Sequence, residues 1–212
     1  MPERKNHMNT WDNLADEKTL KTTAAALIAN GIDVQVTENK ETAKAKTLEL
    51  LPPESEVMTM TSATLDSAGI TQEINRKDGN YMPVRDKLYA MDRNTQAQEM
   101  NRMGATPNIA IGSVHAVTED GHILIASNTG SQLPAYAYGA LKVILVVGTQ
   151  KIVKNIDEGM KRIYEYTLPL ESERAKKAYG VPGSSVNKIL IINKEGTPGR
   201  ITIVFVKENL GY

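Results

Sequence analysis

Apolar and polar residues along the chain alternate between a helical period and a strand period. Near the start, Leu20 and Leu27 share one face of a helix predicted over residues 14–30, with Asp12 as its cap and Gly31 as its end. Later segments repeat this alternation. The further predicted elements are strands at 32–37, 56–60, 112–117, 122–126, 143–147, 188–193 and 200–206, and helices at 39–51, 65–70, 86–103, 133–139, 155–167 and 171–179.

This order of elements predicts an α/β fold. The run at residues 143–147 is continuously apolar, which is typical of a strand covered on both faces of a parallel sheet. The last two strands, 188–193 and 200–206, are expected to pair as a hairpin across the EGTPG turn. The expected organisation is an N-terminal helical segment, residues 1–31, packed on an α/β domain of residues 32–212.

The central region, residues 112–151, carries the clearest functional pattern. It reads as a strand, a TEDG hairpin turn, a second strand, the polar loop SNTGSQ, a short helix and a buried strand. The loop therefore lies at a helix N-terminus, where free backbone N–H groups favour an anion. The region predicts a ligand-binding site.

Composition narrows the function classes. The chain has 212 residues with 25 basic and 25 acidic side chains, so no net charge attracts nucleic acid or an anionic membrane. It has no cysteine, which excludes disulfides, thiolate nucleophiles and cysteine-ligated metals. The histidines, His7, His115 and His122, are scattered, so no metal site is predicted. A charged N-terminus and short apolar runs favour a cytoplasmic protein.

Four sequence blocks carry a family resemblance. They are TSATLDSAGI at 61–70, GSVHAV through QKIV at 112–153, IDEGMKRIYEYTLPLE at 156–171 and RITIVFVKENLGY at 200–212. On these blocks the chain resembles the LUD domain family, the lactate-utilisation proteins of LutC and YkgG type. The resemblance implies a Rossmann-like three-layer α/β sandwich with a mostly parallel sheet and an antiparallel hairpin, similar to glucosamine-phosphate deaminase, ribose-phosphate isomerase and CoA transferases.

The resemblance also implies a link to organic-acid metabolism. Some members of the family occur in a lactate oxidation system beside iron–sulfur subunits, and some relatives carry a cysteine cluster near the C-terminus. This chain has YGVPGSSVNK there and no cysteine. A cluster-binding role therefore does not carry over, and the link to lactate is one of association.

Two polar loops and one lysine supply the candidate ligand-binding residues. These are Thr61, Ser62 and Thr64 in the first loop, Ser127, Asn128, Thr129, Gly130 and Ser131 in the second, and Lys151 after the buried strand. Hydroxyls at a helix N-terminus suit a phosphate or carboxylate, and a lysine adds a point charge. The alternative is structural: Ser62, Thr64 or Ser131 caps a helix, and Lys151 lies on the surface.

Two further residues are candidates for proton transfer. His115 has a side chain whose ordinary pKa is near neutrality, and Glu119 lies in the TEDG turn. The alternatives are a structural histidine and a solvated glutamate beside the ordinary turn chemistry of Asp120 and Gly121.

Three functions remain open from the sequence. The first is binding of a small anionic metabolite, and the second is an isomerase or acyl/CoA-transferase-like enzyme acting on a phosphorylated or CoA-linked substrate. The third is a non-catalytic accessory subunit. Besides a small anionic metabolite, the expected partners are further copies of the chain in a homo-oligomer, or an oxidoreductase complex to which the protein is accessory. No particular cofactor is predicted.

Overall fold

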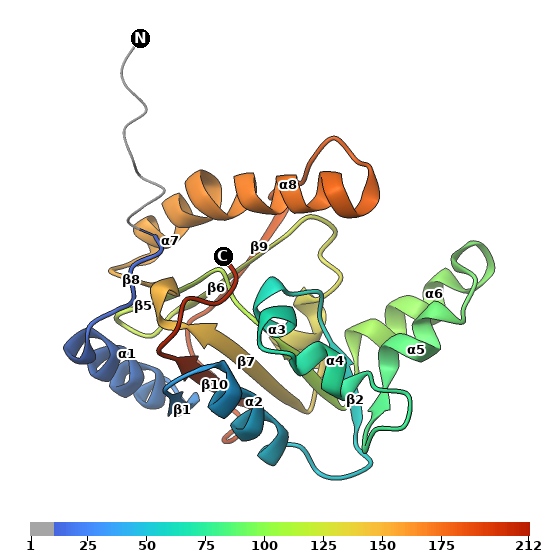
Figure 1. Ribbon diagram of the computed structural model, residues 1–212, viewed down its shortest axis with the longest axis horizontal. Helices are drawn as coiled ribbons and strands as arrows, with labels where there is room; N and C mark the ends of the chain where they lie inside the picture. The colour runs from blue at the N-terminus through green and yellow to red at the C-terminus, as the bar shows by residue number, and fades with distance from the viewer. Residues whose placement is uncertain (1–10) are drawn as a thin grey trace.

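Two β-sheets lie face to face in the computed structural model, which describes residues 11–212 (Figure 1). The larger sheet has the order β1-β10-β7-β4-β2-β3, and all its neighbours pair in parallel. In that order its strands are Asp33–Thr37, Ile201–Val206, Lys142–Gly148, Ile109–Gly112, Glu56–Thr59 and Met82–Pro83. The smaller sheet has the order β8-β5-β6-β9, with strands Ile152–Val153, Ala116–Thr118, Ile123–Ser127 and Lys188–Ile192.

Helices cover one face of the larger sheet. These are α2 (Lys40–Glu49), α3 (Ala63–Ser67) and α4 (Ile70–Ile74) (Figure 1). Along β7, Ile144 and Val146 pack in the core beneath these helices, whereas Val143 and Leu145 pack in the core on the opposite face. Burial on both faces explains why this strand is continuously apolar.

The smaller sheet covers much of the opposite face of the larger one. It is joined there by α1 (Glu17–Ala29) and the π-helix η2 (Ala135–Gly139), whose apolar side chains enter the same core. The outer face of the smaller sheet carries α7 (Ile156–Arg162), and α8 (Leu168–Tyr179) lies beyond α7 in the chain (Figure 1). The predicted α/β class, with a mostly parallel sheet and an antiparallel hairpin of β5 and β6, is confirmed.

The expected break between the helices at 155–167 and 171–179 is wrong. The π-helix η4 (Ile163–Thr167) joins α7 directly to α8, and Pro169 lies in the first turn of α8. A proline is accommodated there because the π-helical turn before it interrupts the regular i→i−4 hydrogen-bond pattern, which proline cannot complete.

The helix ends are only partly as predicted. Asn39 caps α2 and forms a reciprocal capping box with Thr42, and Gly31 has the left-handed backbone that ends α1. The expected cap of α1 is wrong, because Asp16 accepts the hydrogen bond from Thr19 N at 2.7 Å. Asp12 instead accepts a hydrogen bond from Tyr166.

The hairpin expected between the last two strands is wrong. Strand β9 pairs antiparallel with β6 at an edge of the smaller sheet, whereas β10 lies between β1 and β7 in the larger sheet. The side chains explain the separation. All six residues of β10 are buried, as a central strand requires, whereas most of β9 is partly exposed.

The chain crosses from one sheet to the other within a single predicted strand. Residues 112–117 were expected as one strand, but β4 ends at Gly112 and β5 begins at Ala116. The connecting residues 113–115 therefore pass the carboxyl end of the larger sheet. A short 3₁₀ turn, η3 (Thr149–Lys151), follows β7 at the same edge.

Two helices project from the β2 end of the larger sheet (Figure 1). They are α5 (Val84–Tyr89) and α6 (Arg93–Ala105), where a single helix over 86–103 was expected. Helix α6 has no buried residue, which agrees with its polar sequence.

The N-terminal helix shares the core of the main fold. Leu20 and Leu27 pack in the same cluster as residues of β7 and β10. The domain boundary at residue 31 stays a prediction, and residues 1–10, with His7, lie outside the described part of the chain. Among residues 11–212, no helix combines the length and apolar character needed to cross a bilayer.

Candidate functional site

A cavity of about 1020 Å³ opens at the carboxyl ends of β2, β4 and β7. These three strands are neighbours in the parallel sheet, so the loops that follow them converge at one edge. Helices α5, α6 and α8 provide further wall residues. The predicted site residues that line the cavity are Thr61, Ser62, Thr64, His115, Ser127, Asn128, Thr129, Gly130, Ser131 and Lys151.

Lys151 lies in the cavity wall with its side chain almost fully buried. Its Nζ donates to Thr64 Oγ1 at 2.9 Å, to Val114 O at 3.1 Å and to Ser113 Oγ at 3.2 Å. Burial, and then the charge of Arg162, hold the pKa of the Lys151 amine well below its usual range. The surface position considered for this lysine is therefore wrong.

Arg162 is a second buried cation, behind the cavity wall. Its Nη1 donates to His115 O at 2.6 Å and to Thr167 Oγ1 at 3.2 Å, while Nε and Nη2 have no hydrogen-bond partner among the described residues. Burial lowers the pKa of Arg162 to about 10. Within residues 11–212 neither Arg162 nor Lys151 forms a salt bridge with a carboxylate.

The first polar loop combines structural and ligand-facing groups. Ser62 caps α3 by accepting from Leu65 N at 3.4 Å, so its structural interpretation is supported. Thr64 accepts from Lys151 and donates to Leu210 O at 3.2 Å. Thr61 is exposed and accepts from Arg85 Nη2 at 2.5 Å.

The second polar loop uses its own side chains to satisfy part of its backbone. Gly130 N donates to Ser127 Oγ at 2.8 Å, and Ser131 N donates to Thr129 Oγ1 at 3.3 Å. These two amides thus donate hydrogen bonds within the loop and are not free to bind a ligand. The prediction that free backbone N–H groups of this loop bind an anion is therefore weakened. Lys151 is the cationic group of the site instead.

His115 lies in the crossing between the sheets and is partly buried. Its Nδ1 accepts from Ala126 N at 3.0 Å, which leaves the proton of a neutral ring on Nε2. Burial, and then the charges of Lys151 and Arg162, lower the pKa of His115 to about 3. At neutral pH His115 is an uncharged hydrogen-bond donor, and it is poorly suited to act as a general base.

The sequence profile of the LUD domain matches residues 20–206. The chain belongs to the LUD domain family. No curated protein sequence matches it. Among solved structures it is similar to a DUF162 family protein from Deinococcus radiodurans, at 12% identity and a TM-score of 0.55, over 92% of this chain and 99% of that one.

Two weaker structural likenesses were also found. One is a D-ribose-5-phosphate isomerase in complex with phospho-erythronic acid, at 11% identity and a TM-score of 0.40, over 81% of this chain and 95% of that one. The other is eIF2B beta from Chaetomium thermophilum, at 12% identity and a TM-score of 0.37, over 55% and 43%.

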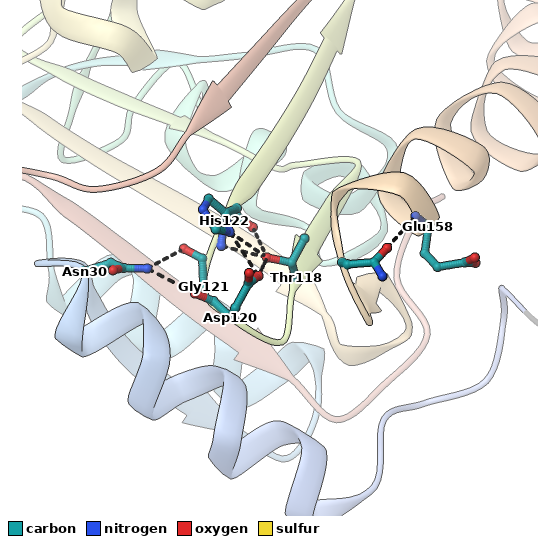
Figure 2. A network of polar contacts seen from close by, with 7 residues as sticks. Asn30, Thr118, Asp120, Gly121, His122 and Glu158 are labelled. Atoms are coloured by element: carbon teal, nitrogen blue, oxygen red, sulfur yellow. Dashed lines mark hydrogen bonds and ion pairs between the residues drawn. The ribbon is translucent and has the colours of Figure 1, made fainter.

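Glu119 is the one candidate that this LUD domain places outside the cavity. It lies in the hairpin turn between β5 and β6, where its backbone N–H donates to Val153 O at 2.9 Å. The turn is fixed against the end of α1 by Asn30, whose Nδ2 donates to Asp120 O and Gly121 O, both at 3.2 Å (Figure 2). Thr118 donates to Asp120 Oδ1 within the same turn. Turn formation accounts for these residues.

Several groups of the LUD domain site were not predicted from the sequence. Glu171 lines the cavity, accepts from Tyr212 Oη at 2.6 Å and pairs with Arg174 at 2.8 Å. Burial acts to raise the pKa of Glu171, but the hydrogen bonds from Arg174 and Tyr212 outweigh it and lower the pKa. No local motif signals this cluster, because α8 and the C-terminal segment meet only in the fold. No group of three potential metal ligands occurs in residues 11–212.

Proposed function

We propose that this LUD domain protein binds a small anionic metabolite in the cavity, with Lys151 as the principal anchor. The observation that carries the proposal is the burial of Lys151 and Arg162 without a carboxylate partner among the described residues. Burial disfavours the protonated form of Lys151, and an anion in the cavity favours it, so protonation of this amine and binding of the anion strengthen each other.

The neutral groups around Lys151 complete such a site. Thr64 and Ser113 hold Nζ in place, and the uncharged His115 offers its Nε2–H. Two further cations at the wall, Arg85 and Arg93, form no salt bridge within residues 11–212. A carboxylate or phosphate is the ligand chemistry that these donors suit.

The association of the LUD domain family with lactate utilisation makes an organic acid the first class to test. A cytoplasmic location agrees with such a substrate. The enzyme alternative has less support, because Glu119 lies outside the cavity and His115 is a weak base. The accessory-subunit alternative shares the same ligand site and predicts binding without turnover.

The proposal is tested by thermal shift and calorimetry with lactate, pyruvate, sugar phosphates, nucleotides and CoA esters. A ligand present at about a hundred times its dissociation constant stabilises the protein by roughly 2.7 kcal/mol. We expect Lys151→Met to weaken binding of the best anion by about tenfold or more, since a charge-assisted hydrogen bond is lost.

The matched control is Lys154→Met, which removes an exposed lysine three residues further on. It should bind the same anion as tightly as the unaltered protein. The proposal is wrong if no anion stabilises the protein, or if the Lys151 and Lys154 variants bind equally well.

A further inference from the structure

Tyr136 lies in the cavity wall and also packs in the core between the two sheets. The residue is 1% exposed, and its hydroxyl lies over Gly112 at the end of β4. A Cβ added to Gly112 would lie 1.7 Å from that hydroxyl oxygen, so only glycine leaves room for it. The same short helix leaves Tyr138 90% exposed.

The backbone that carries Tyr136 is held firmly. Arg200 Nη2 donates to the carbonyls of Tyr136 at 2.9 Å and Ala135 at 3.2 Å, and its Nε donates to Ala140 O at 3.0 Å. Glu195 fixes the guanidinium through a 2.6 Å ion pair that is itself largely buried. The tyrosine is therefore preorganised before any ligand arrives.

The Tyr136 hydroxyl has no hydrogen-bond partner among residues 11–212, and it is not one of the fully enclosed polar atoms there, so it is open to the cavity that the residue lines. Buried tyrosine hydroxyls usually find a partner. Burial raises the pKa of Tyr136, so the group keeps its proton and acts as a neutral donor.

The hydroxyl and the Lys151 ammonium belong to one part of the cavity. Gly112, beneath the hydroxyl, is followed directly by Ser113, whose Oγ lies 3.2 Å from Lys151 Nζ. The side chains of Tyr136 and Lys151 therefore both line the cavity at the carboxyl end of β4.

We infer that the Tyr136 hydroxyl contacts the ligand and selects anions that carry an uncharged oxygen, a hydroxyl or a carbonyl, in addition to the acid group. This inference rests on the proposed anion site at Lys151. The anionic group engages the ammonium, and the neutral oxygen accepts from Tyr136. A site built to hydrogen-bond such an oxygen discriminates against an analogue that lacks it, because the buried donor is then left unpaired.

The test uses two pairs of probes that differ only in neutral oxygens. These are pyruvate or L-lactate against propionate, and glycerol 3-phosphate against propyl phosphate, each measured by isothermal calorimetry. For at least one pair, the unaltered protein should prefer the oxygen-bearing member by about fivefold or more. Tyr136→Phe should reduce that preference to about twofold or less while its melting temperature stays close to that of the unaltered protein.

The matched control is Tyr138→Phe on the same helix, which should keep the full preference. If Tyr136→Phe keeps it as well, or weakens both members of a pair equally, the inference is wrong while the anion site stands. If no probe binds, or if Lys151→Met binds every probe normally, the anion site fails and the inference fails with it.

Discussion

At the scale of single residues, burial decides which groups of the cavity can carry charge. His115 was a candidate for proton transfer because its ordinary pKa is near neutrality, but its position beside Lys151 and Arg162 lowers that pKa to about 3. The sequence shows the residue type but not its neighbours, since Arg162 is 47 residues away.

The lowered pKa of His115 makes a prediction about acid stability. Between pH 6.5 and pH 3 the unfolded chain binds a proton that the folded protein does not, so the free energy of unfolding falls as the pH falls. The titration of His115 alone should lower the free energy of unfolding by about 2 kcal/mol as the pH falls from 7.5 to 5. Urea unfolding of the unaltered protein and of His115→Asn should show a difference that shrinks towards acid pH. Parallel pH curves for the two proteins would contradict the assignment.

At the scale of secondary structure, the sequence predicted most elements but not all their neighbours. The buried run of β7 is a local signal, and it is confirmed. The pairing of β9 with β6 is not local, because about sixty residues separate the two strands. KILII and ITIVFV are both rich in apolar residues, so the sequence alone does not distinguish the edge strand β9 from the central strand β10.

The π-helix η2 is held by a clamp, the buried ion pair of Arg200 and Glu195, and this gives a second stability prediction. Arg200→Met leaves Glu195 and three backbone carbonyls without their donor, so we expect a loss of about 3–5 kcal/mol in the free energy of unfolding. Arg102→Met, at an exposed position on α6, is the control and should change it by less than about 0.5 kcal/mol. Urea denaturation measures both, and equal stabilities would show that η2 does not need the clamp.

At the scale of the whole molecule, the fold assembles the cavity from segments that are distant in sequence. The loop after β2 and Lys151 after β7 meet at one edge because parallel strands of one sheet end together, whereas the loop after β6 reaches the cavity from the smaller sheet. Ten of the eleven candidate residues line the cavity. Glu119 does not, since its hairpin faces α1. The contribution of α8 and Tyr212 was missed because it arises only from packing of the outer helical layer.

Because of this assembly, replacing Lys151 should have opposite effects on stability without ligand and on ligand binding. Without a ligand, the buried amine must stay desolvated without a carboxylate partner, so Lys151→Met should raise the free energy of unfolding by about 1–3 kcal/mol in a buffer free of carboxylates and phosphate. With a saturating anion the order should reverse, because only the unaltered protein gains binding energy. Thermal denaturation with and without the best anion tests both halves. If the variant is the less stable protein without ligand, the hydrogen bonds to Thr64, Ser113 and Val114 compensate for the burial of the amine. An anion would then gain nothing from neutralising a buried charge, and the proposal would lose its main support.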